Sequence, residues 1–129
     1  MTQAVLDASA ILAYLKAEPG ADAVRPHLPG ATASAVNVAE AGSKLVDRGM
    51  GEHDMRAAIA GLGLNVVAFD ESAALAAATL CARTRKSGLS LGDRACLALG
   101  MARNLPVLTA DRSWAGLDLG VEIRLIRGP

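Results

Sequence analysis

Short apolar runs alternate along this chain with longer stretches in which apolar side chains recur every three or four residues. Runs of the first kind predict buried strands, and stretches of the second kind predict helices with one apolar face. The predicted strands are residues 4–6, 31–35, 64–69, 106–109 and 121–126. The predicted helices are residues 8–18, 20–28, 37–49, 51–62, 70–86 and 90–103, the last beginning at Ser90 or Gly92.

Turn and cap residues separate these segments. Pro19 and Pro29, each followed by glycine, end the first two helices, and Asn37 and Asp70 are the predicted N-caps of later ones. Strands that alternate with helices predict the α/β class, here a central parallel sheet of four to five strands flanked by helices on both faces. A chain of 129 residues has the usual size of one domain, so we expect a single domain over residues 1–129.

The cysteines and the N-terminal segment indicate the cellular setting. Cys81 and Cys96 lie among apolar residues at a spacing that matches neither a zinc site nor a disulfide framework, which predicts two buried, reduced thiols. Residues 1–15 lack a basic region, and Asp7 and Ser9 interrupt their apolar run. We therefore expect a cytoplasmic protein that does not associate with a membrane.

Four acidic residues occupy positions where α/β proteins place their chemistry. Asp7 and Asp111 each follow a predicted strand, and ligands bind beyond the carboxyl ends of such strands. Glu40 and Asp93 lie in the predicted first turns of helices. Each acid alone has a plain explanation as an N-cap, a partner of the helix dipole or a solvated charge. As a set, they are expected to converge on one rim of the sheet.

A cluster of carboxylates predicts a cation. Neighbouring carboxylates repel one another and raise one another's pKa unless a hard divalent ion neutralises them. Oxygen ligands without histidine or cysteine favour Mg²⁺ or Mn²⁺ over zinc. The chemistry that fits is hydrolysis of a phosphodiester by water that the metal activates.

Charge placement, not net charge, indicates where a nucleic acid would bind. Thirteen basic and thirteen acidic residues give a formal net charge of zero, so the charge sum does not favour a nucleic-acid partner. Basic side chains nevertheless gather before Asp93 and beside Asp111, where they would contact phosphates or simply form solvated helix ends. The RNA-binding candidates are Arg83, Arg85, Lys86, Arg94 and Arg112.

Four segments around these acids resemble a PIN domain, and specifically the VapC toxins of bacterial type II (VapBC) toxin-antitoxin systems. They are residues 5–15 around Asp7, 34–41 around Glu40, 89–99 around Asp93 and 107–114 around Asp111. Together the four segments extend over most of the chain, in the order and spacing of that family.

The resemblance implies a Mg²⁺- or Mn²⁺-dependent endoribonuclease that cleaves structured RNA, such as tRNA or rRNA, and thereby inhibits translation. It also implies a homodimer that is neutralised by a cognate VapB-type antitoxin. By position, Asp7, Glu40 and Asp93 match the metal-binding acids of the family, with Asp111 as the fourth acid. Ser9 and Thr109 match polar positions beside the site that hydrogen-bond a carboxylate or a metal-bound water.

Other classes of protein fit less well. A phosphatase of the haloacid dehalogenase kind requires a second aspartate where this chain has Ser9, and a receiver domain requires a lysine after the strand that ends at Thr109. A PIN-like module that binds RNA or protein without cleavage remains the alternative. Trp114 would stack on a base in either case, but a lone tryptophan in an aromatic-poor chain more often lies in the core or an interface.

Overall fold

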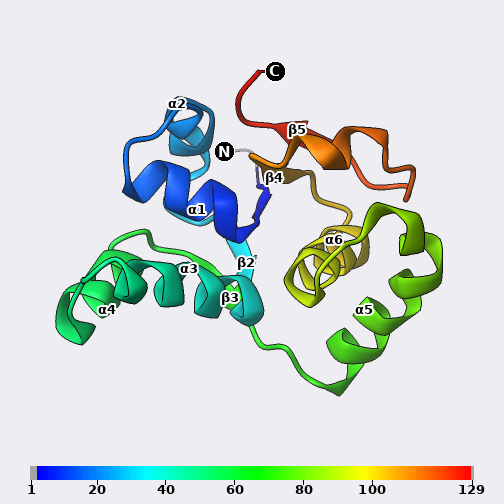
Figure 1. Cartoon of the computed structure of the whole chain (residues 1–129), viewed down its shortest axis with the longest axis horizontal. Coiled ribbons are helices and arrows are strands. Elements are labelled where there is room, and N and C mark those ends of the chain that lie inside the picture. Colours follow the sequence, from blue (N-terminus) through cyan, green and yellow to red (C-terminus); the bar gives the residue numbers. More distant parts are fainter. Residues whose placement is uncertain (1–2, 129) are drawn as a thin grey trace.

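A computed structural model describes residues 3–128 of the chain, which fold into five short strands and the helices between them (Figure 1). The strands are β1 (Val5–Leu6), β2 (Thr32–Ser34), β3 (Asn65–Val67), β4 (Val107–Thr109) and β5 (Ile123–Leu125). The α-helices are α1 (Ala8–Leu15), α2 (Ala21–Val24), α3 (Ala35–Asp47), α4 (Glu52–Ala60), α5 (Glu71–Arg83) and α6 (Leu91–Arg103). Three 3₁₀ helices complete the fold, η1 (Arg25–His27), η2 (Arg85–Ser87) and η3 (Arg112–Gly116).

The strands form one parallel sheet in the order β3-β2-β1-β4-β5. Val5 in β1 pairs with Thr32 in β2 on one side and with Val107 in β4 on the other. The chain adds β2 and β3 on one side of β1, and then returns to its other side for β4 and β5. The strand order therefore reverses between β1 and β4, where open parallel sheets bind their ligands.

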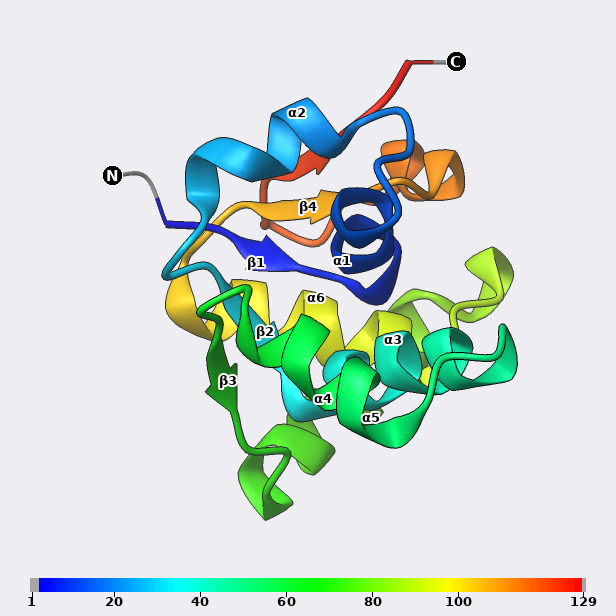
Figure 2. The ribbon, with the colours of Figure 1, turned by 90° about the vertical axis from the view of Figure 1, so that its left-hand side faces the viewer.

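Helices cover both faces of the sheet. Adjacent strand residues point to opposite faces, so Leu6 and Leu108 pack with α1, α3 and α4, whereas Val5 and Val107 pack with α5, α6 and η3. Figure 2 shows β1 and β4 between α2 on one side and α6 on the other. The predicted α/β class, with a parallel sheet flanked on both faces, is confirmed, and the sheet has five strands.

The start of α3 differs from its prediction. The helix begins at Ala35 because Ser34, the last residue of β2, is its N-cap and accepts a hydrogen bond from the backbone N–H of Val36 at 3.2 Å. The prediction of Asn37 as the N-cap was therefore wrong. Asn37 is the third residue of the helix, and Glu40 lies in its second turn instead of its first.

The other predicted caps are close to the observed ones. Asp70 caps α5 through a 2.9 Å bond from the N–H of Ala73, although α5 ends at Arg83 and continues only as η2. Ser90 caps α6 and forms a capping box with Asp93. Side-chain oxygens at these positions satisfy backbone N–H groups that the first turn leaves without partners.

The interior confirms one cysteine prediction and corrects the other. Cys96 on α6 is buried, but Cys81 is exposed because α5 packs on the molecule through one face, with Leu80 inward and Cys81 outward. Trp114 is 0% exposed, so it belongs to the core beside α6 and does not stack on a base. Within residues 3–128, no helix has the length and apolar character that crossing a membrane requires.

Candidate active site

Asp7 lies at the carboxyl end of β1 and is the N-cap of α1. Its Oδ1 atom accepts hydrogen bonds from the N–H of Ala10 at 2.8 Å and from the hydroxyl of Ser9 at 2.7 Å. Its Oδ2 atom accepts one from the hydroxyl of Thr109, at the end of β4, at 2.5 Å. Asp7 is 5% exposed, and its carboxylate is held in one orientation by groups at the start of α1 and at the end of β4.

The same two hydroxyls also hold the loop after β4. Ser9 Oγ accepts a hydrogen bond from the N–H of Ala110 at 2.9 Å, and Thr109 Oγ1 accepts one from the N–H of Asp111 at 3.0 Å. Each hydroxyl thus donates to Asp7 and accepts from the loop. The structure places both predicted supporting residues, Ser9 and Thr109, directly on the Asp7 carboxylate.

The charge of Asp7 is costly in this position. Burial raises the pKa of Asp7 above its ordinary value, and the hydrogen bonds from Thr109, Ser9 and Ala10 oppose that rise without cancelling it. The negative charge of Asp93 raises the Asp7 pKa further, so the two acids act on one another. A nearby cation would favour the ionised form of both carboxylates.

Glu40 approaches α6 from α3. Its Oε1 atom accepts a 2.9 Å hydrogen bond from the side-chain nitrogen of Asn37, which also donates to the carbonyl oxygen of Gly92 at 3.1 Å. A Cβ atom on Gly92 would lie 2.2 Å from Glu40 Oε2 and 2.3 Å from Oε1. Glycine at position 92 therefore makes the room that the Glu40 carboxylate occupies at the first turn of α6.

Asp93 is half-buried in that same turn. Its Oδ2 atom accepts a hydrogen bond from the N–H of Ser90 at 3.0 Å, and its own N–H donates to the Ser90 hydroxyl at 3.1 Å. One turn further along α6, burial raises the pKa of the Cys96 thiol well above its usual value, and the charges of Asp7, Asp93 and Glu40 raise it further. The charges of three of the four predicted acids therefore act on the buried Cys96.

Asp111 does not join this group in the same way. It is exposed at the start of η3, where its Oδ1 atom accepts hydrogen bonds from the N–H of Ser113 at 2.9 Å and from the Ser113 hydroxyl at 2.7 Å. Its connection to Asp7 passes through its backbone N–H and the hydroxyl of Thr109. Its carboxylate is directed toward its own turn.

The residues present suit a hard divalent cation, although they do not form a complete set of ligands. Within residues 3–128, no three His, Cys, Asp or Glu side chains form a ready metal site. The donor atoms near Cys96 are carboxylate oxygens, which Mg²⁺ and Mn²⁺ prefer. A buried carboxylate with a raised pKa beside a second acid would be stabilised by such an ion.

Sequence reasoning missed the roles of Asn37 and Gly92 in this site. Asn37 has the spacing of three residues from Glu40 that places two side chains on one face of a helix, and this signal was readable. The approach of Glu40 to Gly92 was not readable, because it joins helices that are separated by more than forty residues along the chain.

Two of the five basic candidates donate a hydrogen bond to a backbone carbonyl oxygen. Arg83 donates to the carbonyl oxygen of Asp118 at 3.4 Å, and the half-buried Arg94 donates to that of Ala77 at 3.1 Å. These two bonds attach Arg83 to the loop before β5 and α6 to α5. Arg83 is exposed like the other three candidates, which are Arg85 and Lys86 in η2 and Arg112 in η3.

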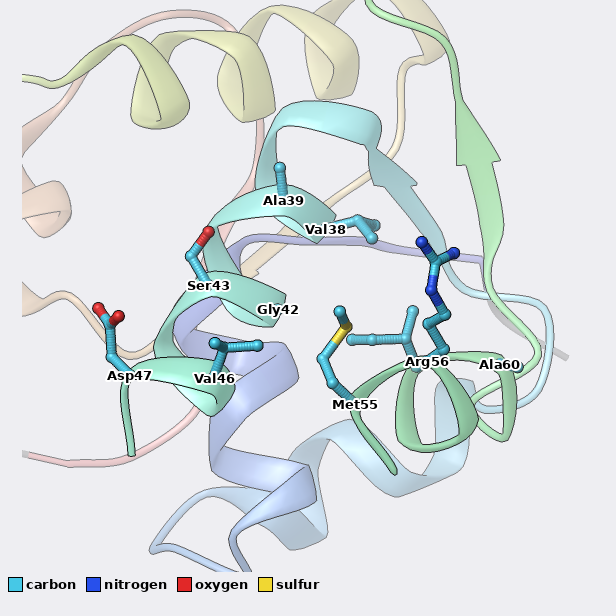
Figure 3. Close-up of a pocket in the computed structure, with 10 residues that line it drawn as sticks. Val38, Ala39, Gly42, Ser43, Val46, Asp47, Met55, Arg56 and Ala60 are labelled. Atoms are coloured by element: carbon cyan, nitrogen blue, oxygen red, sulfur yellow. The ribbon is translucent and has the colours of Figure 1, made fainter. Parts of the chain in front are cut away.

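A groove of about 780 Å³ lies elsewhere, between α3 and α4 (Figure 3). Its walls carry the apolar side chains of Val38, Val46 and Met55, and Asp47 and Arg56 supply its charges. None of the four predicted acids lines this groove. It is a surface feature beside the helix that carries Glu40, and it is distinct from the acidic site.

The sequence matches the family model of the PIN domain over residues 4–118, so this chain belongs to the PIN domain family. The resemblance that the four acidic segments indicated is thereby confirmed. No match was found among curated proteins.

Solved structures of VapC toxins have the same fold. VapBC2 from Rickettsia felis, bound to a DNA fragment from its promoter, is similar with a TM-score of 0.74 and 11% identity, over 95% of this chain and 98% of that one. VapC20 from Mycobacterium tuberculosis, described as a sarcin-ricin loop cleaving toxin, is similar with a TM-score of 0.73 and 19% identity, over 92% of this chain and 98% of that one. DNA-bound VapBC from Salmonella typhimurium is similar with a TM-score of 0.74 and 17% identity, over 98% of this chain and 99% of that one. At these identities, the likeness establishes the fold.

Proposed function

We propose that this chain is a VapC-type toxin, a Mg²⁺- or Mn²⁺-dependent endoribonuclease that cleaves structured RNA and thereby inhibits translation. The observation that carries this proposal is that Glu40 packs against Gly92, the residue before Asp93, while Asp7 follows β1 beside the point where the strand order reverses, in a chain of the PIN domain family. We place the substrate among structured RNAs, tRNA or rRNA, and the VapC20 neighbour, described as a sarcin-ricin loop cleaving toxin, supports cleavage of a structured loop.

The proposed roles follow from the contacts of each side chain. Asp7, Glu40 and Asp93 would hold the ion, and Asp111 would be the fourth acid at the outer edge. A divalent ion held by these carboxylates would supply the activation of water for attack on the phosphodiester and the stabilisation of the leaving oxygen. Thr109, with Ser9, orients the Asp7 carboxylate through hydrogen bonds at 2.5 Å and 2.7 Å.

The exposed basic side chains are proposed to contact the RNA backbone. Arg85 and Lys86 lie in η2, which leads to the helix that carries Asp93, and Arg112 follows Asp111. Arg83 and Arg94 are weaker candidates because each already donates to a backbone carbonyl oxygen. Contacts to phosphates would make RNA binding weaken with salt.

A VapB-type antitoxin is the proposed partner, and the proposed setting is the cytoplasm. This part of the proposal is supported by the similarity to chains from VapBC complexes. An antitoxin segment that covers the acidic site would block access of RNA, and coexpression of the cognate antitoxin should restore growth to cells that produce this chain. We also propose a homodimer, which light scattering of the purified chain would test.

The test of the nuclease is cleavage of total bacterial RNA by the purified chain with Mg²⁺ or Mn²⁺. The controls are a chelator, the Asp93→Asn variant, and the matched Asp54→Asn variant at an exposed position in α4. Discrete fragments that require the metal, that disappear with Asp93→Asn and that persist with Asp54→Asn would support the proposal.

Two results would contradict it. Equal cleavage by the Asp93→Asn variant would refute the site assignment. Intact RNA under all conditions, with the folded chain still retarding RNA in a gel, would favour the alternative of a PIN-like module that binds without cutting.

A further inference from the structure

Asn37 is almost fully enclosed between α3 and α6. Its side chain is 1% exposed and donates both of its hydrogen bonds toward the acidic site, to Glu40 Oε1 at 2.9 Å and to the carbonyl oxygen of Gly92 at 3.1 Å. Both partners are acceptors only, so the amide nitrogen, and not the amide oxygen, must face them. The chemistry therefore fixes the orientation of the amide group.

The other atom of this amide has no partner. Asn37 Oδ1 is buried and accepts no hydrogen bond from any residue between 3 and 128. A buried acceptor without a donor is costly. The side chain thus makes two bonds through its nitrogen while its oxygen stays unpaired.

The two bonds link the two helices that carry acids. Glu40 is one turn from Asn37 on α3, and Gly92 immediately precedes Asp93 on α6. Glu40 Oε1 is occupied by the amide, whereas Oε2 accepts no hydrogen bond within residues 3–128 and remains available to a ligand. One amide group thus fixes both the orientation of Glu40 and its spacing from the turn that holds Asp93.

We propose that Asn37 is a positioning residue of the acidic site, which sets the Glu40 carboxylate for a divalent cation by anchoring it to the Gly92 carbonyl oxygen. This inference rests on the proposed function. A long, flexible glutamate side chain would otherwise be free to occupy several rotamers. Residues that hold metal ligands in this way typically change metal affinity by about 10- to 100-fold when they are replaced.

The test is a double-variant cycle with Mn²⁺ affinity as the readout, measured by calorimetry in the absence of RNA. The four chains are the unsubstituted protein, Asn37→Ala, Glu40→Gln and the double variant. Asn65→Ala, at an exposed position on β3, is the matched control. Asn37→Leu fills the space of the amide without donating a hydrogen bond, and it replaces Asn37→Ala if that variant does not fold by circular dichroism.

The proposal expects Asn37→Ala to weaken Mn²⁺ binding by about tenfold in the unsubstituted background and by less than about twofold in the Glu40→Gln background. Asn65→Ala should bind as the unsubstituted chain does. An equal loss in both backgrounds would assign Asn37 a general structural role and overturn the proposal, as would unchanged affinity. An unsubstituted chain that binds no Mn²⁺ would instead overturn the proposed function, and this inference with it.

Discussion

Replacing Gly92 with alanine should displace the Glu40 carboxylate while leaving the stability of the fold nearly unchanged. The added Cβ atom would lie 2.2 Å from Glu40 Oε2, 2.3 Å from Oε1 and 2.4 Å from Cδ. Ordinary contact begins at 3.4 Å, so the carboxylate must withdraw by about 1.2 Å, the difference between 3.4 and 2.2 Å. It can do so because it is the end of a flexible side chain.

The two expected effects differ in size. Displacing a reacting or ligating group by about 1 Å costs about 100-fold in rate. Alanine favours a helix over glycine by up to about 1 kcal/mol, whereas loss of the Asn37–Glu40 hydrogen bond costs about 1 kcal/mol. These contributions nearly cancel, so the melting temperature should change by less than about 5 °C.

The assay compares initial rates of metal-dependent RNA cleavage with melting temperatures from circular dichroism. Gly51→Ala is the matched control, because Gly51 also begins a helix and a Cβ atom there has nothing within 4 Å. It should cleave RNA at the unsubstituted rate. In a Glu40→Ala background the obstruction is absent, so Gly92→Ala should have no further effect.

Either of two results would refute this reasoning. A Gly92→Ala chain that cleaves at the unsubstituted rate would show that the position of Glu40 does not limit catalysis. A chain that loses activity equally in the Glu40→Ala background would show that the added methyl group acts through something other than Glu40.

Three further predictions concern the neighbours of the site and the core. Asp7→Asn should raise the melting temperature of the metal-free protein at neutral pH, because burial raises the Asp7 pKa. In the unsubstituted chain, the stability contributed by Asp7 is complete below the usual carboxyl pKa and is lost as pH rises through the raised pKa. The melting temperatures of the variant and the unsubstituted chain should therefore converge in acid, and a constant difference across pH would contradict this. Thr109→Val should slow RNA cleavage at least about tenfold, because it removes the donor to Asp7 and the acceptor of the Asp111 N–H. The control variant Thr79→Val, on the exposed face of α5, should not slow cleavage. Equal cleavage rates for the two variants would contradict the role of Thr109. Trp114→Ala should lower the free energy of unfolding by about 3–5 kcal/mol in urea titrations, because Trp114 is fully buried; a loss under about 1 kcal/mol would place the side chain outside the core.

The sequence predicted the elements whose signals are local. Asp7 and Asp70 are acids between an extended segment and a helical one, and both are N-caps in the structure. Ser90 is likewise the cap of α6. In each case the residue type and the change in apolar spacing occur at the same place, so no distant contact is needed to interpret them.

The start of α3 shows where local signals fail. Ser34 and Asn37 are both good N-cap residues, and nothing in the neighbouring sequence selects between them. The pairing of Ser34 with Val67 in β3 selects Ser34 as the N-cap, because β2 then ends at Ser34. The Asn37 amide is left to donate to Glu40. The orientation of Asp111 was readable from the serine two residues later, which forms a turn with it.

The hydrogen bond between Thr109 and Asp7 joins residues 102 positions apart in the sequence, since β4 pairs with β1 after six α-helices have been added. During synthesis the first residues leave the ribosome long before Thr109 does. Asp7 therefore lacks one of its holding hydroxyls, and β1 lacks one of its neighbouring strands, until most of the chain has been made. A nascent chain thus carries Asp7 in an unfinished arrangement, and the proposed nuclease site is complete only after β4 has been made.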